Sequence, residues 1–170
     1  GKEGAEQKIR LVDGKAELSV MLCREGQTRT YQFSIHTKSS DSSLSQLQVS
    51  FSTIVNVFEM EMEPAFQPDI TEYNSSLFGS GKDREPYYIW PVAADSKATV
   101  KVTAVYGVEG VRSGQEITPA TAVFDDQIRA RYKVRPLSET DPARICITVT
   151  AEDGVTTRSY YINLYRNNDW

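Results

Sequence analysis

The sequence lacks several features that would point directly to a chemistry or to a membrane. Its 170 residues contain one histidine and two cysteines, and no run of about eighteen apolar residues occurs in it. A zinc site takes three or four ligands, mostly histidine and cysteine, and a Ser-His-Asp triad would have to use the single histidine. A membrane-spanning helix needs a long apolar run. We therefore expect no zinc chemistry, no serine-based triad and no direct insertion into a membrane.

Other catalytic signatures are missing as well. Neither a Gly-x-Ser-x-Gly elbow nor a phosphate-binding glycine loop is present. The single histidine, His36, ends a predicted strand, where it is expected to be an ordinary surface residue. A glycosidase needs only two carboxylates, and the candidates for such a pair are Glu59, Glu61, Asp125 and Asp126. Acidic residues on strand faces and loop tips are usually solvated, so we expect no enzyme activity, no metal ligand and no cofactor.

The charge balance also excludes one class of partner. The formal net charge is -4 and the isoelectric point is about 5.1, whereas a general nucleic-acid binder presents a basic surface that releases counterions. Apolar residues make up 39% and charged residues 25%, which is typical of a folded globular chain. The sequence begins Gly-Lys-Glu-Gly rather than with Met, which we interpret as a piece of a longer protein.

The two cysteines and one tripeptide bear on the compartment. Cys23 and Cys146 both lie in predicted strands, and they are either two free thiols or one disulfide, which would imply an oxidising compartment. Asn74-Ser75-Ser76 is an N-glycosylation sequon in a predicted polar loop, so Asn74 is a candidate glycan site. This sequon favours a secreted context.

Short alternating segments dominate the chain. The clearest is the stretch Ile145–Arg166, in which two arms of period-two alternation flank Glu152-Asp153-Gly154, a typical turn sequence. Elsewhere, short runs rich in β-branched and aromatic residues recur with turn signals between them, and no helical period persists for ten residues. The pattern predicts an all-β fold, an antiparallel β-sandwich.

A second hairpin repeats the first. Ala16–Leu22 and Tyr31–Ile35 alternate around a Glu25-Gly26 turn, and aligning Gly26 with Gly154 superposes the two hairpins at a spacing of about 128 residues. The polar stretch Ser39–Ser43 follows, which we interpret as a flexible linker at a domain boundary. Alone, this hairpin would expose an apolar face through Leu18, Val20 and Phe33, so we expect it to pack on the main sandwich or on another chain.

Three groups of side chains are candidates for binding. Glu59, Glu61 and Glu63 form an acidic stripe, and a basic stripe consists of Arg129, Arg131, Lys133 and Arg135. These stripes either pair across a sheet, or form separate contact surfaces, or are ordinary solvated faces. An aromatic cluster, Tyr87, Tyr88 and Trp90, is either a platform for stacking sugars or part of the core with only one ring exposed.

Three blocks resemble a known family. These are Leu44–Ser50 (LSQLQVS), Pro64–Tyr73 (PAFQPDITEY) and Ile147–Arg166 (ITVTAEDGVTTRSYYINLYR). Their sequence and order resemble the cadherin-like β-sandwich domains that are repeated in cell-surface and secreted proteins. The resemblance implies an immunoglobulin-like sandwich, usually in tandem and outside the cytosol, and it implies no catalytic residue set. The calcium-ligand runs of true cadherins are missing, so calcium bridging is not expected.

These observations define the predicted organisation. Residues 1–41 are a β-hairpin that resembles the end of a preceding repeat, or added strands of the same sandwich, and residues 42–170 are a cadherin-like β-sandwich domain. In the Pro64–Tyr73 block, two prolines fix the backbone so that Phe66 and Tyr73 enter the core.

The predicted function is that of a non-catalytic extracellular module, a spacer or an adhesion-type protein-interaction domain within a larger surface or secreted protein. Its expected partners are another protein or neighbouring domains of the same chain. The alternative is a carbohydrate-binding accessory domain attached to a glycan-active enzyme.

Overall fold

The structure, a computed structural model, describes residues 8–52, 57–76, 86–124 and 127–166. The chain divides into two compact units, residues 1–38 (unit 1) and 39–170 (unit 2), and each is described here by itself. The regular elements in the described residues are all strands, which confirms the predicted all-β class.

The described residues form two strands in unit 1 and ten strands in unit 2. Those of unit 1 are β1 (Lys15–Arg24) and β2 (Gln27–His36). Those of unit 2 are β3 (Leu44–Ser52), β4 (Val57–Met60), β5 (Met62–Glu63), β6 (Glu72–Ser76), β7 (Tyr87–Ala93), β8 (Thr99–Tyr106), β9 (Pro119–Phe124), β10 (Gln127–Val134), β11 (Ala143–Thr150) and β12 (Thr157–Tyr165).

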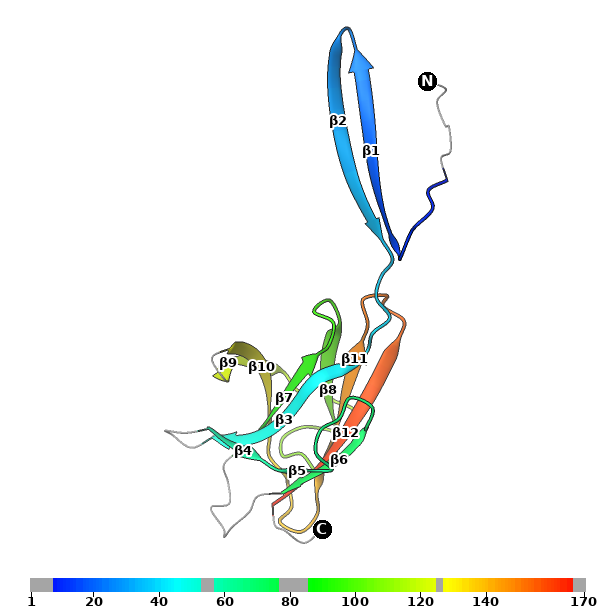
Figure 1. The fold of residues 1–170 in the computed structure, drawn as a ribbon. Helices are drawn as coiled ribbons and strands as arrows, with labels where there is room; N and C mark the ends of the chain where they lie inside the picture. The colour runs from blue at the N-terminus through cyan, green and yellow to red at the C-terminus, as the bar shows by residue number, and fades with distance from the viewer. Residues whose placement is uncertain (1–7, 53–56, 77–85, 125–126, 167–170) are drawn as a thin grey trace. The chain divides into compact units, whose positions relative to one another are not determined.

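Unit 2 is a sandwich of two five-stranded sheets. The β3 sheet has the order β4-β3-β7-β10-β9, and the β11 sheet has the order β5-β6-β12-β11-β8. Figure 1 shows β3 and β7 in one layer and β11 and β12 in the other. All pairs are antiparallel except β6 with β12, which is parallel. The predicted antiparallel sandwich is therefore confirmed, with one parallel pair added.

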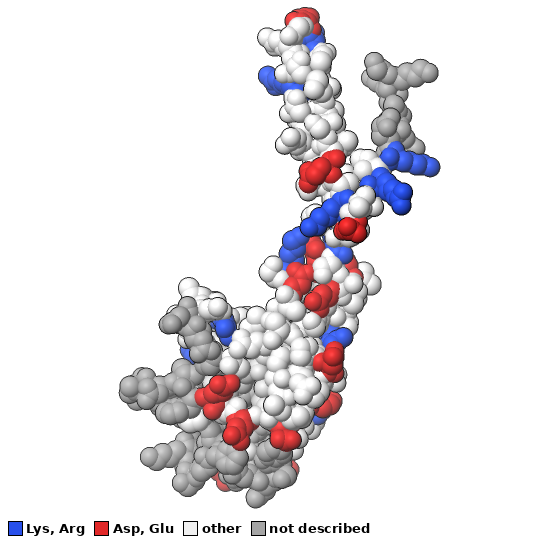
Figure 2. Space-filling view, in the orientation of Figure 1, with Lys and Arg blue, Asp and Glu red and all other residues white. Residues whose placement is uncertain are grey.

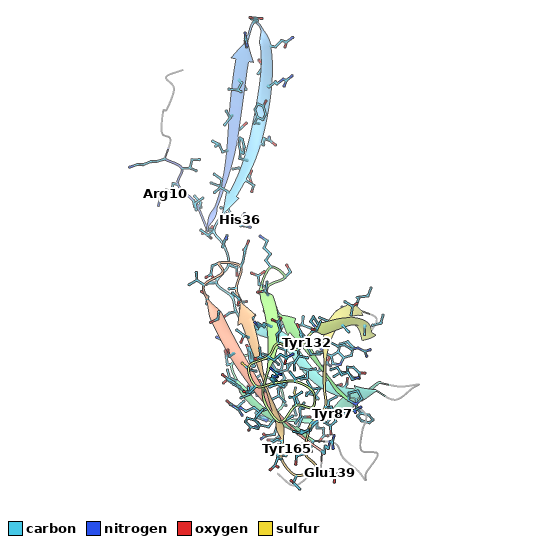
Figure 3. All side chains as sticks on the ribbon, turned by 180° about the vertical axis from the view of Figure 1, so that it is seen from behind. Arg10, His36, Tyr87, Tyr132, Glu139 and Tyr165 are labelled. Carbon is cyan, nitrogen blue, oxygen red and sulfur yellow. The ribbon has the colours of Figure 1, made fainter. Side chains whose placement is uncertain are left out.

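The core follows from period-two alternation. Along β11, buried and half-buried residues alternate without a break, so Ile145, Ile147 and Val149 face the β3 sheet and are fully buried. Tyr87 and Tyr132 lie in the same core (Figure 3), and their burial raises the pKa of each phenol because the ionised form loses its hydration.

A bulge explains why strict alternation fails at the start of β3. Leu44 and Leu47 are three residues apart, an odd spacing that would place them on opposite faces of a regular strand. Pairing of β3 with β7 shifts register between Leu44 and Gln46, so one residue is absorbed and both leucines are buried. The spacing in LSQLQVS is thus a consequence of a local irregularity.

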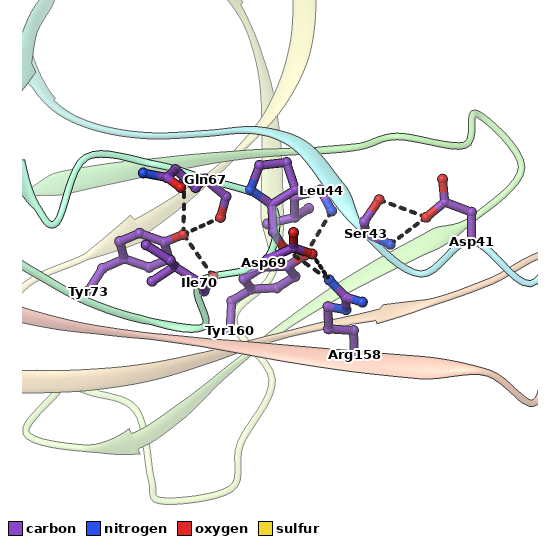
Figure 4. A network of polar contacts seen from close by, with 10 residues as sticks. Asp41, Ser43, Leu44, Gln67, Asp69, Ile70, Tyr73, Arg158 and Tyr160 are labelled. Atoms are coloured by element: carbon purple, nitrogen blue, oxygen red, sulfur yellow. Dashed lines mark hydrogen bonds and ion pairs between the residues drawn. The ribbon is translucent and has the colours of Figure 1, made fainter.

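The segment between β5 and β6 is fixed by two tyrosine hydroxyls (Figure 4). The Tyr73 hydroxyl accepts a hydrogen bond from Gln67 N and lies 2.7 Å from Gln67 O and 2.8 Å from Ile70 O, one of which receives its proton. The Tyr160 hydroxyl accepts from Leu44 N at 3.1 Å and donates to Pro68 O at 2.9 Å. Tyr160 therefore joins the start of β3, the crossing segment and β12 at one buried point.

The two aromatic rings of this block differ from each other in burial. Tyr73 is fully buried, as predicted. Phe66 is only half-buried and packs against the edge of the core, with its ring centroid 6.0 Å from that of Tyr73. The prediction that Phe66 enters the core is therefore wrong in part, because the crossing segment carries its ring to the margin of the sandwich.

Residues 39–43 are held against the sandwich, contrary to the flexible linker that we predicted. Ser39 N donates to the Glu152 carboxylate at 3.0 Å, and Ser39 O accepts from Asp153 N. Ser43 donates to Asp41 through both its backbone N and its hydroxyl, and these hydrogen bonds lower the pKa of Asp41. The segment therefore belongs to unit 2, where it covers the β11–β12 turn.

Unit 1 is a regular two-stranded hairpin. All ten residues of β1 pair with those of β2, from Lys15 opposite His36 to Arg24 opposite Gln27. The turn places Glu25 and Gly26 at positive φ, as a two-residue hairpin loop with the twist of the strands requires. This confirms the predicted second hairpin.

The Tyr160 hydroxyl makes a testable contribution to stability. Tyr160→Phe keeps the ring but leaves the buried Leu44 N without its acceptor, so we expect a loss of about 1–3 kcal/mol in the free energy of unfolding. Urea denaturation of the full chain measures this. Tyr161→Phe, on the outer face of the same strand, is the matched control and should change stability by less than about 0.5 kcal/mol. Equal effects of the two substitutions would contradict the role assigned to Tyr160.

Candidate interaction surface

The aromatic cluster does not form a platform. Tyr87 and Trp90 are 3% and 0% exposed, and they lie on opposite faces of β7. Tyr87 faces the core, where its hydroxyl donates to Tyr165 O at 3.2 Å. Tyr88, on the outer face with Trp90, is half-buried. The prediction that Tyr87, Tyr88 and Trp90 form a ligand platform is therefore wrong, because a sugar cannot stack on buried rings.

Trp90 is buried by neighbours on the outer face of the β3 sheet. Its Nε1 donates to the Ser50 hydroxyl at 2.7 Å, and Ser50 is itself fully buried. The Arg131 guanidinium lies 4.2 Å from the centroid of the Tyr88 ring and 5.7 Å from that of Trp90. Gln48 is the cross-strand neighbour of Trp90. These side chains form a second small packed layer outside the sandwich core.

The four cations of the basic stripe lie in different environments. Arg131 covers aromatic rings, and Arg129 donates to Gln46 Oε1 at 2.6 Å. Arg135 lies beyond the end of β10 and forms an ion pair of 3.5 Å with Glu109. Lys133 is exposed. A contact surface along this stripe remains a prediction, and most of its charge is already engaged by the chain's own residues.

The acidic stripe is divided between the two sheets. Glu59 lies in β4, Glu63 lies in β5, and Glu61 lies at the crossing between them. β4 is separated from β10 by β3 and β7. The alternative in which the acidic and basic stripes pair across neighbouring strands is therefore wrong. Asp125 and Asp126 lie outside the described residues.

A groove lies where the chain crosses from one sheet to the other. It has a volume of about 570 Å³, and its lining consists of Leu47, Glu59, Met60, Glu61, Met62, Ala65 and Phe66. The floor is apolar, and the two glutamates are exposed at its rim. β4 and β5 are both edge strands, so within the described residues one side of each has no neighbouring strand and offers its backbone groups to a partner. We call this feature the β4–β5 groove.

The charge around the groove favours a cationic partner. The Glu59 carboxylate accepts one hydrogen bond, from Gln48 Nε2 at 3.0 Å. Figure 2 shows acidic side chains over the β4–β5 region of unit 2. In the sequence of residues 39–170, twelve lysines and arginines stand against eighteen aspartates and glutamates. An apolar floor with an acidic rim suits an extended segment that carries apolar and cationic side chains.

Asn74 lies in a strand, whereas we predicted a loop. It is in β6, which pairs with β5 on one side and with β12 on the other. Its Oδ1 accepts a hydrogen bond from Asn163 Nδ2 at 2.9 Å, and Ser76, the third residue of the sequon, is 2% exposed. Glycosylation at Asn74 stays a prediction, and in the folded unit the sequon is not on an accessible loop.

Both cysteines are free thiols in the structure. Cys23 is exposed in β1 of unit 1, with its sulfur 3.4 Å from Thr28 Oγ1. Cys146 is half-buried in β11 of unit 2, with its sulfur 3.6 Å from Thr148 Oγ1. The two cysteines lie in different units, so a Cys23–Cys146 disulfide stays a prediction.

The described residues contain neither a metal-binding cluster nor a membrane-spanning helix. Among residues 8–52, 57–76, 86–124 and 127–166, no group of three or more His, Cys, Asp or Glu residues is placed to hold a metal ion. The same segments contain no helix long and apolar enough to cross a membrane. His36, the only histidine, is an exposed residue at the end of β2.

Sequence reasoning missed two sets of residues at this surface. Gln48 and Ser50 enclose Trp90, and their polar alternation in LSQLQVS was visible, but a fully buried serine cannot be recognised without its partner from another strand. Leu47 and Ala65 line the β4–β5 groove. The Met-Glu-Met-Glu-Pro-Ala-Phe stretch indicates an amphipathic segment. The groove forms only because this segment crosses from one sheet to the other.

The fold and this surface define unit 2 as a two-layered β-sandwich module. The family model of the cadherin-like beta sandwich domain matches residues 44–167, so the chain belongs to the cadherin-like beta sandwich domain family. This confirms the family predicted from the three sequence blocks, and the β1–β2 hairpin lies outside the matched range. A search of curated proteins found no match to this chain.

Trp90 and Phe66 should differ in their contribution to stability. Trp90→Ala empties a fully buried site and leaves Ser50 without its donor, so we expect a cost of about 3–5 kcal/mol. Phe66→Ala should cost about half as much, since the ring is half-buried and water can fill the groove. Urea denaturation of the full chain compares the two. A larger effect at Phe66 than at Trp90 would contradict this assignment of core and margin.

Proposed function

We propose that the chain is a non-catalytic module of a larger extracellular or cell-surface protein, and that it binds another protein through the β4–β5 groove. The observation that carries this proposal is the combination of apolar floor, acidic rim and two edge strands at one place. The membership of the cadherin-like family is compatible with a non-catalytic role. In the same module, the rigid sandwich also serves as a spacer between its neighbours.

The chemistry of the groove specifies the partner. Met60 and Met62 have flexible thioether side chains, which adapt to apolar groups of different shape. Glu59 and Glu61 at the rim favour lysine or arginine next to those groups. An extended segment can also pair with the free side of β4 or β5 through its backbone. The proposed ligand is therefore an extended peptide segment in which apolar and cationic residues alternate.

The carbohydrate-binding alternative loses its main support. That alternative relied on exposed aromatic rings at Tyr87, Tyr88 and Trp90. Two of these rings are buried, and an arginine lies over the third. We therefore propose protein binding alone.

Selection of peptides tests the proposed groove. A random peptide library displayed on phage should, when selected on the intact protein, yield sequences in which apolar residues adjoin lysine or arginine. Binding of a selected peptide should weaken at least about tenfold in the double variant Glu59→Gln, Glu61→Gln and should weaken with rising salt. Fluorescence anisotropy with the labelled peptide measures both effects.

A control variant tests whether the loss of any surface carboxylate weakens peptide binding. Glu116 is an exposed carboxylate that forms an ion pair with Lys101 at 3.1 Å on the other end of the β11 sheet. Glu116→Gln should leave peptide binding unchanged. Equal loss of binding in both variants, or selected peptides without cationic residues, would refute the proposed role of the groove.

The proposed compartment has its own test. In the natural host, a protease that cannot enter intact cells should degrade the protein in the cell-surface or secreted fraction, while a cytosolic marker survives. The readout is an immunoblot against unit 2 before and after cell lysis. Protection of the protein until lysis would contradict the extracellular assignment, and it would leave the groove experiment unaffected.

A further inference from the structure

The two hairpins of the chain, β1–β2 and β11–β12, match in their cross-strand residue pairs, each of which we call a rung. In β1–β2, the apolar face is formed by four cross-strand pairs, Ala16 with Ile35, Leu18 with Phe33, Val20 with Tyr31 and Leu22 with Arg29. In β11–β12, the corresponding pairs on the face toward the core are Ala143 with Leu164, Ile145 with Ile162, Ile147 with Tyr160 and Val149 with Arg158. Each rung of one hairpin thus has a rung of the same kind, in the same order, in the other.

The matched faces differ sharply in burial. In β11–β12, the side chains of Ile145, Ile162 and Tyr160 are fully buried under the β3 sheet. In β1–β2, the equivalent Phe33 and Tyr31 are 49% and 43% exposed. Among residues 8–38, the described part of unit 1, these are the only two strands, and a two-stranded hairpin with an exposed apolar face is at best marginally stable in water.

In β11–β12, the last two cross-strand pairs also bind the segment that crosses between the sheets. On β12, the Tyr160 hydroxyl donates to Pro68 O at 2.9 Å, and Arg158 donates to Pro68 O at 3.0 Å and contacts the Asp69 carboxylate at 3.4 Å. This pair therefore clamps a Pro-Asp step in the segment that crosses between the sheets (Figure 4). Tyr31 and Arg29 occupy the same two rungs on β2. Within residues 8–38 of their own unit, neither side chain has a hydrogen-bond partner, although both backbones belong to the β1–β2 ladder.

We infer that β1–β2 is the closing hairpin of a second cadherin-like sandwich, and that its apolar face is covered by the other strands of that repeat, encoded before residue 1 of this chain. In the completed repeat, Tyr31 and Arg29 bind the carbonyl oxygen of a proline and the acidic residue after it. This inference deepens the proposed function, because it names one neighbour of the module, and it rests on the proposal that the chain is part of a larger protein.

The sequence encoded before residue 1 should contain the Pro-Asp step or its equivalent. Pro68 precedes Tyr160 by 92 residues. The preceding repeat should therefore carry a proline followed by an acidic residue roughly 60–90 residues before Tyr31, with alternating strands between, as expected of a sandwich of about 100 residues. A gene product without such a segment would overturn the inference at once.

Hydrogen exchange provides the physical test. The natural protein extended upstream by about 100 residues is compared with residues 1–170 alone, at the same low concentration. In the extended protein, the amides of β1–β2 should exchange at least about a hundredfold more slowly than in the shorter chain. The amides of β11–β12 should exchange equally in both, and they serve as the internal reference.

Matched substitutions identify the covered face. Phe33→Asp places a charge on the apolar face, and Gln32→Asp places the same charge one residue away on the opposite face. Phe33→Asp should abolish the protection of β1–β2 in the extended protein, while Gln32→Asp should retain it. Tyr31→Phe should lower that protection about tenfold, since it removes only the hydroxyl. In each variant, unchanged exchange in β11–β12 shows that unit 2 remains folded.

Three results would overturn the inference. One is equal exchange of β1–β2 in the long and short chains. Another is strong protection in the dilute short chain, which would mean that the hairpin packs on its own sandwich. The third is protection that rises with the concentration of the short chain, which would mean packing on a second copy. None of these results changes peptide binding at the β4–β5 groove, so the two proposals fail independently.

Discussion

The structure depends on one constraint, namely that each sheet with an apolar face must be covered by another layer. In unit 2, the β3 sheet and the β11 sheet cover each other, and the fully buried side chains of Ile89, Ile147 and Leu164 belong to both layers of that core. In unit 1, the same alternation produces the same kind of face, yet its described residues form only two strands and no second layer. The contrast between the two units follows from the number of layers rather than from the sequences of the hairpins.

Polar groups position the layers once burial has brought them together. The Tyr160 hydroxyl, between Leu44 N and Pro68 O, aligns three segments that are about 24 to 116 residues apart in the chain. Tyr73 fixes the same crossing segment from the other side through Gln67 and Ile70. These bonds decide where the crossing runs, and its course brings Met60, Met62 and Phe66 to the margin where the β4–β5 groove opens. The candidate binding site is thus a consequence of the way the sandwich is closed.

Trp90 is buried on the outer face of the β3 sheet, so it is a packing residue rather than a binding residue. Trp90 is shielded by Ser50 and Arg131, so the strongest aromatic signal of the sequence serves packing. Three cations of the basic stripe also contact their own chain: Arg129 through a hydrogen bond, Arg131 through aromatic rings and Arg135 through an ion pair. The β4–β5 groove has fewer aromatic and cationic residues, and its two rim glutamates are exposed beside the apolar floor. The recognition chemistry that we propose for it depends on flexible methionines and on these two carboxylates.

The sequence by itself determined the strands, the two hairpins and the family, because period-two alternation, acidic-Gly turns and three ordered blocks are local properties of the chain. Tertiary structure decided the rest. The bulge at Leu44, the burial of Trp90, the marginal place of Phe66 and the strand position of Asn74 all depend on which segments become neighbours. Alternation assigns successive residues to the two faces of a strand. Whether each face contacts protein or water is decided only by the layers that pack against it.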